Sequence, residues 1–183
     1  REHQGLRVLA MSRIVAGKGF EKVINSLTAC DPSVTLVVAG DGPLRKDLES
    51  KVISLGLQER VMFVGWLEKK QKEEAFRDCD VFCLPSTFDS FGMVFIEAMA
   101  YGKPIIALAN GPTEYVVSNE CGILISPDDD SALACALERL RQQSYQRRAM
   151  GSAGRHRVRT LFSSVAVKPK IICAIAQVCS LEK

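Results

Sequence analysis

The chain of 183 residues is 47% hydrophobic and 25% charged, and its formal net charge is +3. The length favours one domain with a full hydrophobic core, and so small a positive charge gives no indication of a nucleic-acid partner. Seven cysteines include no Cys-x-x-Cys pair, and His3 and His156 are the only histidines, which argues against a zinc site. We expect reduced thiols in a cytoplasmic protein, without disulfides, a signal peptide or an apolar run of about 18 residues that would span a membrane.

Short apolar runs alternate along the chain with segments of helical periodicity. The predicted order is strand 6–11, helix 20–27, strand 34–39, helix 44–55, strand 61–64, helix 71–77, strand 81–84, helix 94–101, strand 105–108, a short helix from 113, strand 122–125, helix 131–141 and further helix to the end. Alternation of this kind predicts an α/β fold, in which a Rossmann-like, doubly wound parallel sheet carries helices on both faces and extra carboxyl-terminal helices. The first residue is not Met and a strand begins almost at once, so we expect a domain of a longer protein.

Glycine and charged residues cluster in the loops that follow the predicted strands. These loops contain Arg13 to Gly19, Gly40 to Pro43, Gly65 and Trp66, Pro85 to Gly92, and Asn110 to Pro112. In an open parallel sheet the ligand binds beyond the carboxyl ends of the strands. The sequence therefore predicts a binding site at this edge.

The first of these loops has the chemistry of a phosphate site. Arg13 offers a planar fork and Lys18 a compact charge, and Gly17 and Gly19 allow a close approach of backbone to ligand. The loop is not a P-loop, because Lys18 is followed by Gly19 and the earlier glycine is missing. Gly40 and Gly42 do not form a dinucleotide fingerprint, because Arg45 stands at the position of its third glycine. The alternative is a pair of solvated surface cations beside a turn. In the second loop, Gly40 would let a nucleoside come close.

The segment 85–98 is the most informative. Glu97 is the only charged residue between Val94 and Gly102, and a carboxylate in so apolar a helix needs a partner. The hydroxyls of a ribose would be good donors to it; the alternative is that local backbone or a core arginine satisfies it. Phe91, Gly92 and Met93 precede or begin this helix, whose amino end favours phosphate through its N–H groups and dipole.

Several motifs together resemble the donor domain of the retaining GT-B glycosyltransferases called group 1. They are Arg13-x4-Lys18-Gly19, Gly40-Asp-Gly-Pro43, Val61-x-Phe-x-Gly65, Pro85-Ser-x-x-Asp-x-Phe-Gly92, Glu97-Ala-Met-Ala-x-Gly-x-Pro104 and Gly122-Ile-Leu-Ile-x-Pro127. The match spans residues 5 to 140 in the order of the family. As a set, these motifs are highly specific.

The resemblance implies a role for each matching residue. Arg13 and Lys18 would hold the donor diphosphate, Glu97 would bind the ribose, and the backbone of Phe91, Gly92 and Met93 would face the distal phosphate and sugar. Trp66 and Leu67 would hold the base, mainly through their backbone. Asp89 stands where the family usually has the catalytic glutamate. Its side chain keeps the charge but is about 1.5 Å shorter, so its direct contact with the sugar and the preference for the sugar could differ from those of the family.

The implied function is retaining transfer of a hexose-type sugar from a nucleoside diphosphate sugar to a glycan or lipid-linked acceptor, in the synthesis of cell-surface polysaccharide or lipopolysaccharide. UDP is the first choice of nucleotide and GDP the second, because UDP donors are commonest in the family. Residues 1–183 would be the donor domain, and an amino-terminal domain outside them would bind the acceptor, so this half alone should be nearly inactive. The alternatives are a sugar-nucleotide epimerase of the same architecture and a non-catalytic nucleotide-binding module.

Two further patterns have an ordinary structural interpretation. The Asp-x-Asp within 128–130 is a metal motif in a different glycosyltransferase fold, but acidic residues here also open a helix; we expect neither a metal nor a cofactor. Seven arginines and no acidic residue lie between 139 and 159. They predict a solvated helical face, and the alternative is contact with anionic lipid at the cytoplasmic face of a membrane.

Overall fold

The computed structural model describes residues 5–87, 91–109, 112–129 and 131–180. Six parallel strands form one sheet in the order β3-β2-β1-β4-β5-β6. The strands are β1 (Leu6–Met11), β2 (Val34–Ala39), β3 (Val61–Gly65), β4 (Val81–Cys83), β5 (Ile105–Leu108) and β6 (Gly122–Ile125). All six predicted strands are confirmed, although β3 ends one residue later and β4 one residue earlier than expected. The strand order reverses between β1 and β4, which is where such sheets bind ligands.

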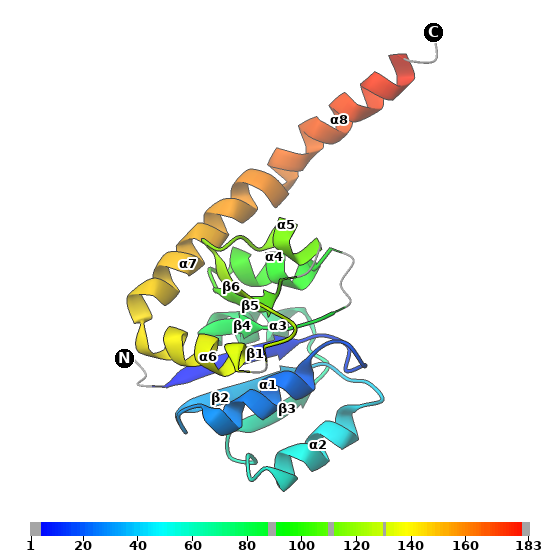
Figure 1. Ribbon diagram of the computed structural model, residues 1–183. Coiled ribbons are helices and arrows are strands. Elements are labelled where there is room, and N and C mark those ends of the chain that lie inside the picture. Colours follow the sequence, from blue (N-terminus) through cyan, green and yellow to red (C-terminus); the bar gives the residue numbers. More distant parts are fainter. Residues whose placement is uncertain (1–4, 88–90, 110–111, 130, 181–183) are drawn as a thin grey trace.

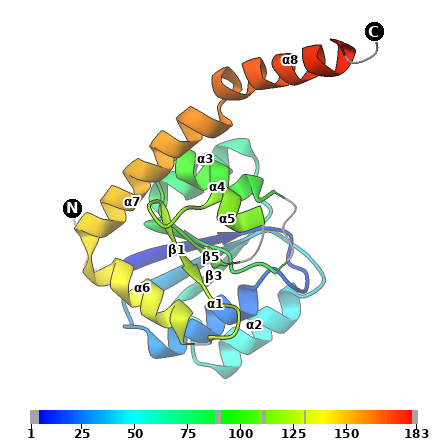
Figure 2. The same ribbon diagram turned by 45° about the horizontal axis from the view of Figure 1, so that its top comes forward.

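The helices cover both faces of this sheet, as predicted. Figures 1 and 2 show α1, α2 and α6 on one side and α3, α4 and α7 on the other. The helices are α1 (Phe20–Ser26), the 3₁₀ helix η1 (Leu27–Ala29), α2 (Arg45–Ser54), α3 (Lys69–Asp78), α4 (Met93–Ala100), α5 (Pro112–Val116), α6 (Ala132–Gln142), α7 (Ser144–Arg157), the π-helical turn η2 (Val158–Phe162) and α8 (Ser164–Ser180). The first predicted helix is therefore shorter than expected and closes with a 3₁₀ turn.

The apolar runs of the sequence form the core. Every residue of β4 and β5 is buried, since helices cover both faces of these central strands. The helix α7 lies unusually close behind α4. A Cβ atom at Gly151 would lie 2.0 Å from the carbonyl oxygen of Gly102, and one at Gly154 would lie 3.1 Å from Cγ of Met99. The absence of side chains at these two positions is what lets α7 pack against α4.

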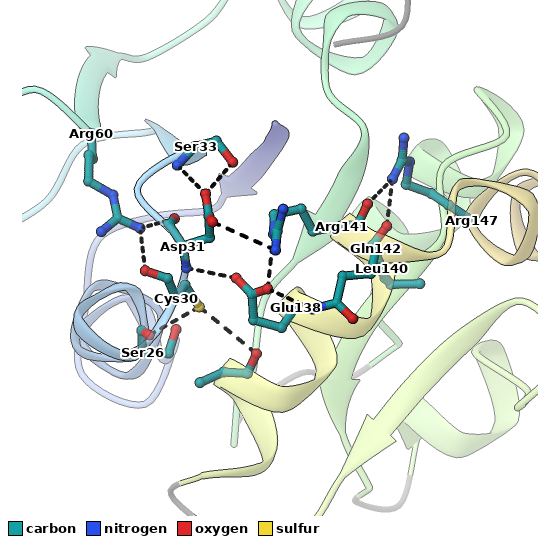
Figure 3. A network of polar contacts seen from close by, with 11 residues as sticks. Ser26, Cys30, Asp31, Ser33, Arg60, Glu138, Leu140, Arg141, Gln142 and Arg147 are labelled. Atoms are coloured by element: carbon teal, nitrogen blue, oxygen red, sulfur yellow. Dashed lines mark hydrogen bonds and ion pairs between the residues drawn. The ribbon is translucent and has the colours of Figure 1, made fainter. Parts of the chain in front are cut away.

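A polar network joins the turn before β2 to α6, a helix about a hundred residues later in the sequence (Figure 3). Glu138 accepts a hydrogen bond from the backbone N–H of Asp31 at 2.7 Å and another from Nε of Arg141 at 2.9 Å. The Asp31 carboxylate accepts from the backbone and hydroxyl of Ser33, which lowers the pKa of Asp31 below its ordinary value. Arg60 donates to the Asp31 carbonyl. These contacts hold α6 against the sheet from outside the hydrophobic core.

The carboxyl-terminal helix α8 projects away from the remainder of the chain in both views (Figures 1 and 2). Helical structure from Ser144 to Ser180 confirms the prediction for this region. Among the helices that the structure describes, none combines the length and apolar content needed to cross a bilayer.

Candidate functional site

A cavity of about 470 Å³ opens at the carboxyl edge of the sheet, beside the reversal of strand order. The ends of β1 and β2, the loop after β3, α3 and the start of α4 all contribute to it. Its walls are formed by Met11, Ser12, Arg13, Ala39, Gly40, Trp66, Leu67, Lys72, Phe91, Gly92, Met93, Val94 and Glu97. Five separate segments of the sequence therefore meet at one place, and most of the predicted site residues are among them.

A larger cavity, of about 570 Å³, lies between α1 and α6, on the face of the sheet that these two helices cover. Its walls include Lys22, Asp129, Cys135 and Glu138, and none of the predicted site residues. Size alone would favour this cavity. The convergence of residues with matching chemistry favours the cavity at the sheet edge as the functional site.

The loops at the sheet edge are joined to one another by their backbones. The N–H of Gly40 donates to the carbonyl of Gly65 at 2.7 Å, and that of Ile14 donates to the carbonyl of Asp41 at 2.8 Å. A Cβ atom at Gly40 would lie 1.9 Å from the Ser12 carbonyl oxygen, and one at Gly42 would lie 2.2 Å from that of Ile14. The sequence predicted that glycine here admits a ligand. The structure shows that Gly40 lines the cavity and that both glycines also admit the neighbouring loop.

The loop that carries Lys18 makes a different contact. The Gly17 carbonyl accepts hydrogen bonds from the backbone and hydroxyl of Thr87, and a Cβ atom at Gly19 would lie 2.3 Å from the Pro85 carbonyl oxygen. Lys18 is half-buried in this loop and is not among the residues that form the walls of the cavity. Arg13 thus forms part of the wall of the cavity, and Lys18 does not. The predicted catalytic residue, Asp89, lies outside the described residues.

Glu97 has a partner that the sequence did not reveal. Nζ of Lys72, on α3, donates to Oε1 of Glu97 at 2.7 Å, and the two side chains are 33% and 40% exposed. Sequence reasoning offered ribose, local backbone or a core arginine as partners for Glu97. The partner is instead a lysine 25 positions earlier, on the neighbouring helix. The charged helix α3 was the only signal of it, because it contains three lysines that could face α4.

Apolar side chains form the rim of the cavity. Trp66 is 72% exposed, and Phe91 and Met93 are also exposed. The Phe91 ring meets the ring of Phe162 edge to face, with centroids 6.1 Å apart. Large apolar side chains exposed around a concave surface are typical of ligand sites, and a planar base could stack on such a rim.

The chemistry of the cavity suits an anionic ligand that also carries hydroxyl groups. Arg13 and the amino end of α4 attract negative charge, since the first N–H groups of a helix and its dipole favour anions. The Glu97 carboxylate accepts hydrogen bonds from hydroxyls. A phosphate, a polyol and a flat ring would each find a matching group within this one cavity.

Other charged residues singled out in the sequence support the structure elsewhere. The Asp129 carboxylate accepts from the backbone N–H groups of Ser131 and Ala132, so it opens α6 as the capping interpretation predicted. Arg147, Arg155 and Arg157 donate to backbone carbonyls, of Leu140, Tyr101 and Tyr115 respectively. These three arginines join elements together, whereas Arg139, Arg148 and Arg159 are exposed, so the prediction of a solvated face is confirmed in part.

Comparison with known proteins identifies the family. The family of glycosyl transferases group 1 matches residues 2–157. LpsD of Rhizobium meliloti, a lipopolysaccharide core biosynthesis glycosyltransferase, is 33% identical over 162 residues, which cover 87% of this chain and 46% of that protein. This chain therefore spans about half the length of that relative.

Solved structures agree with the observed fold. Anabaena HepE, crystallised with UDP and glucose, is 26% identical and superposes with a TM-score of 0.87 over 95% of this chain and 49% of HepE. The C-terminal domain of LpcC, a glycosyl transferase group 1 family protein from Francisella tularensis, is 26% identical, with a TM-score of 0.77 over 87% of this chain and 88% of that one. The chain described here thus belongs to the group 1 glycosyltransferases and has the Rossmann-like fold of a GT-B domain.

Proposed function

We propose that this chain is the donor-binding part of a retaining glycosyltransferase and that its cavity holds a nucleoside diphosphate sugar. The observation that carries the proposal is the meeting of Arg13, Glu97, the amino end of α4 and the Trp66 loop around one cavity of suitable size. Each group matches one part of such a ligand. The complex of the similar protein HepE with UDP and glucose supports the same assignment.

Each part of the ligand has a proposed partner. Arg13 holds the diphosphate together with the amino end of α4, where the backbone of Phe91, Gly92 and Met93 faces the distal phosphate and the sugar. Glu97 accepts hydrogen bonds from the ribose, and Trp66 and Leu67 hold the base. Developing charge on the leaving diphosphate would then be stabilised by fixed donors and by the helix dipole. Lys18 and Asp89 complete the proposal, as diphosphate ligand and catalytic carboxylate.

UDP is the proposed nucleotide, with GDP second, and the proposed acceptor is a glycan or a lipid-linked glycan of a cell-surface polysaccharide or lipopolysaccharide. An acceptor site on an amino-terminal part of the enzyme would complete the reaction, because transfer requires donor and acceptor to be held together. We propose that no metal or cofactor takes part and that the protein works in the cytoplasm, where exposed basic residues of the carboxyl-terminal helices would contact anionic lipid.

Calorimetric titration of the 183-residue chain with UDP, GDP and ADP, with and without EDTA, tests the proposal. Arg13→Ala and Glu97→Gln should each weaken binding of the preferred nucleotide about 10- to 100-fold, which corresponds to loss of one hydrogen bond to a charged group, roughly 1.5–3 kcal/mol. Arg159→Ala and Glu74→Gln change exposed residues outside the cavity and serve as matched controls. They should leave the affinity unchanged within about twofold.

Two results would refute the proposal. The first is that a folded chain binds none of the three nucleotides. The second is that it binds one of them with the same affinity after both cavity substitutions, since the ligand would then occupy another part of the surface. Binding that disappears with EDTA would refute the metal-independent mechanism alone.

A further inference from the structure

The ion pair between Lys72 and Glu97 has no part in the roles proposed above, although both side chains form walls of the candidate cavity. Its length, 2.7 Å between Nζ and Oε1, is that of a charge-assisted hydrogen bond. Both side chains remain partly exposed, so the pair lies at the surface of the cavity and within reach of a ligand. An ammonium group here must therefore either assist or oppose whatever binds to the Glu97 carboxylate.

The position of Lys72 is fixed by the helix that carries it. The helix α3 begins at Lys69, directly after the Trp66 loop, and its first turn is closed by two hydrogen bonds. The backbone N–H of Glu68 donates to the Gln71 side chain at 3.1 Å, and the N–H of Lys72 donates to the Glu68 carbonyl at 2.8 Å. The ammonium group lies 6.0 Å from the ring centre of Phe76, which is buried. Lys72 is thus held near Glu97 by a well-defined helical turn.

The pair also separates two cavities. Beside the candidate site, and sharing Lys72 and Glu97 with it, is a smaller cavity of about 380 Å³ between α3 and α4. Its walls are Lys69, Lys72, Glu73, Phe76, Glu97, Ala100 and Tyr101. Water therefore reaches the pair from both sides in the empty protein and weakens the attraction between the charges. A nucleoside in the candidate cavity would remove water from one side. The attraction between Lys72 and Glu97 would then be strongest when the site is occupied.

We infer that Lys72 is a positioning residue, which holds the Glu97 carboxylate in one orientation for the hydroxyls of the ribose. The inference rests on the proposed function. A carboxylate offers about four lone-pair sites, so one hydrogen bond from an ammonium group leaves acceptor capacity for two hydroxyls. Since the carboxylate is already oriented and its charge is balanced, binding costs less ordering and less desolvation. The opposite arrangement, in which Lys72 competes with the ribose for Glu97, predicts an effect of the opposite sign.

The test measures the affinity of the 183-residue chain for the nucleoside diphosphate it binds best, UDP first, and for the 2′-deoxy form of the same nucleotide. Lys72→Met removes the charge and keeps most of the stem, whereas Lys72→Arg keeps the charge. We expect Lys72→Met to weaken binding of UDP about three- to fivefold, the upper part of the range for one partly exposed charge pair. Lys72→Arg should restore most of the lost affinity. Lys70→Met, an exposed lysine on the same helix and outside the cavity, should change the affinity less than twofold.

Two further readouts separate positioning from a structural role. If Lys72 acts through Glu97 on the ribose, the loss caused by Lys72→Met should shrink to less than twofold for 2′-deoxy-UDP and in a Glu97→Gln background. Equal losses for both nucleotides would overturn the inference, because Lys72 would then contact the base or the phosphates or merely support the fold. Unchanged or tighter UDP binding by a folded Lys72→Met variant would overturn it as well. If the unsubstituted chain binds none of UDP, GDP and ADP, the proposed function is refuted and this inference with it. Equal losses for the two nucleotides, or unchanged or tighter binding by Lys72→Met, would refute this inference alone.

Discussion

Replacement of Gly40 by alanine should both destabilise the chain and weaken the candidate site. Gly40 ends β2 with φ at 131°, a conformation that residues with a side chain rarely adopt. A Cβ atom there would lie 1.9 Å from the Ser12 carbonyl oxygen, whereas ordinary contact begins at about 3.4 Å, so the overlap is about 1.5 Å. That carbonyl belongs to the peptide bond between Ser12 and Arg13. Relief of the overlap must therefore move the backbone from which Arg13 enters the cavity.

Gly56 provides a matched control, because its φ is 68° and no atom lies within 4 Å of its added Cβ. Gly56→Ala should cost only the conformational term, about 1–2 kcal/mol. Gly40→Ala adds an overpacking cost of roughly 1–3 kcal/mol, for a total of about 2–5 kcal/mol. In a chain of this size 1 kcal/mol shifts the midpoint of thermal unfolding by about 2–4 °C. At about 3 °C per kcal/mol, we therefore expect shifts of about 3–6 °C for Gly56→Ala and about 6–15 °C for Gly40→Ala.

Thermal unfolding followed by circular dichroism measures both shifts, and calorimetry below the unfolding range measures nucleotide binding. Gly40→Ala should weaken binding of the preferred nucleotide about tenfold or more, since a small displacement of a ligand-holding group is costly. Gly56→Ala should leave the affinity unchanged. The reasoning is wrong if the two variants unfold at the same temperature, or if Gly40→Ala is destabilised but binds nucleotide normally.

Two further predictions concern the network in Figure 3 and its buried thiol. Glu138→Gln should lower the free energy of unfolding, measured in urea, by about 1–2 kcal/mol, because it weakens the acceptor for the Asp31 N–H and for Arg141. Glu120→Gln changes an exposed residue and should alter this free energy by no more than about 0.5 kcal/mol. Equal effects of the two substitutions would contradict the role of the network. Burial, and secondarily the charge of Glu138, raises the pKa of Cys30 from 9.0 to about 11. The unfolded chain thus releases this proton first, so the stability due to the neutral thiol is complete below pH 9.0 and is lost as the pH rises to about 11. Unfolding in urea across this range should show a shallower decline for Cys30→Ala, and an unchanged slope would contradict it.

The sheet could be predicted from the sequence because its central strands β1, β4 and β5 are buried on both faces. A parallel strand that is covered on both faces appears in the sequence as a short continuous run of apolar residues, which is easy to recognise. Val34–Ala39 and Ile105–Leu108 were predicted with the bounds that the structure shows. The edge at which the cavity opens followed from the same pattern, since all parallel strands end on one side. Only the ends of some elements differed, as at Leu27, where the chain closes α1 with a 3₁₀ turn.

Contacts between side chains far apart in the sequence could not be predicted. Lys72 pairs with Glu97 because of the rotation of α3 relative to α4, and nothing in the local pattern selects Lys72 over Lys69 or Lys70. The contacts of Arg155 and Arg157 on α7 were even harder to predict. Their partners in the described chain include backbone carbonyls, which every residue has, so these contacts leave no mark in the sequence.

The close packing of α7 on α4 has a consequence for how the cavity meets its ligand. Since Gly151 lies against the Gly102 carbonyl, just after α4, and Gly154 lies against the Met99 side chain of α4, this helix is held between the sheet and a second helix. The wall that carries Glu97 and Met93 therefore has little room to retreat. The opposite wall is the exposed Trp66 loop, which has solvent beside it. A ligand would therefore meet one rigid surface and one adaptable surface. The Trp66 loop would accommodate differences in the shape of the base. The distance between the ribose and phosphate sites, which both lie on α4, would stay the same.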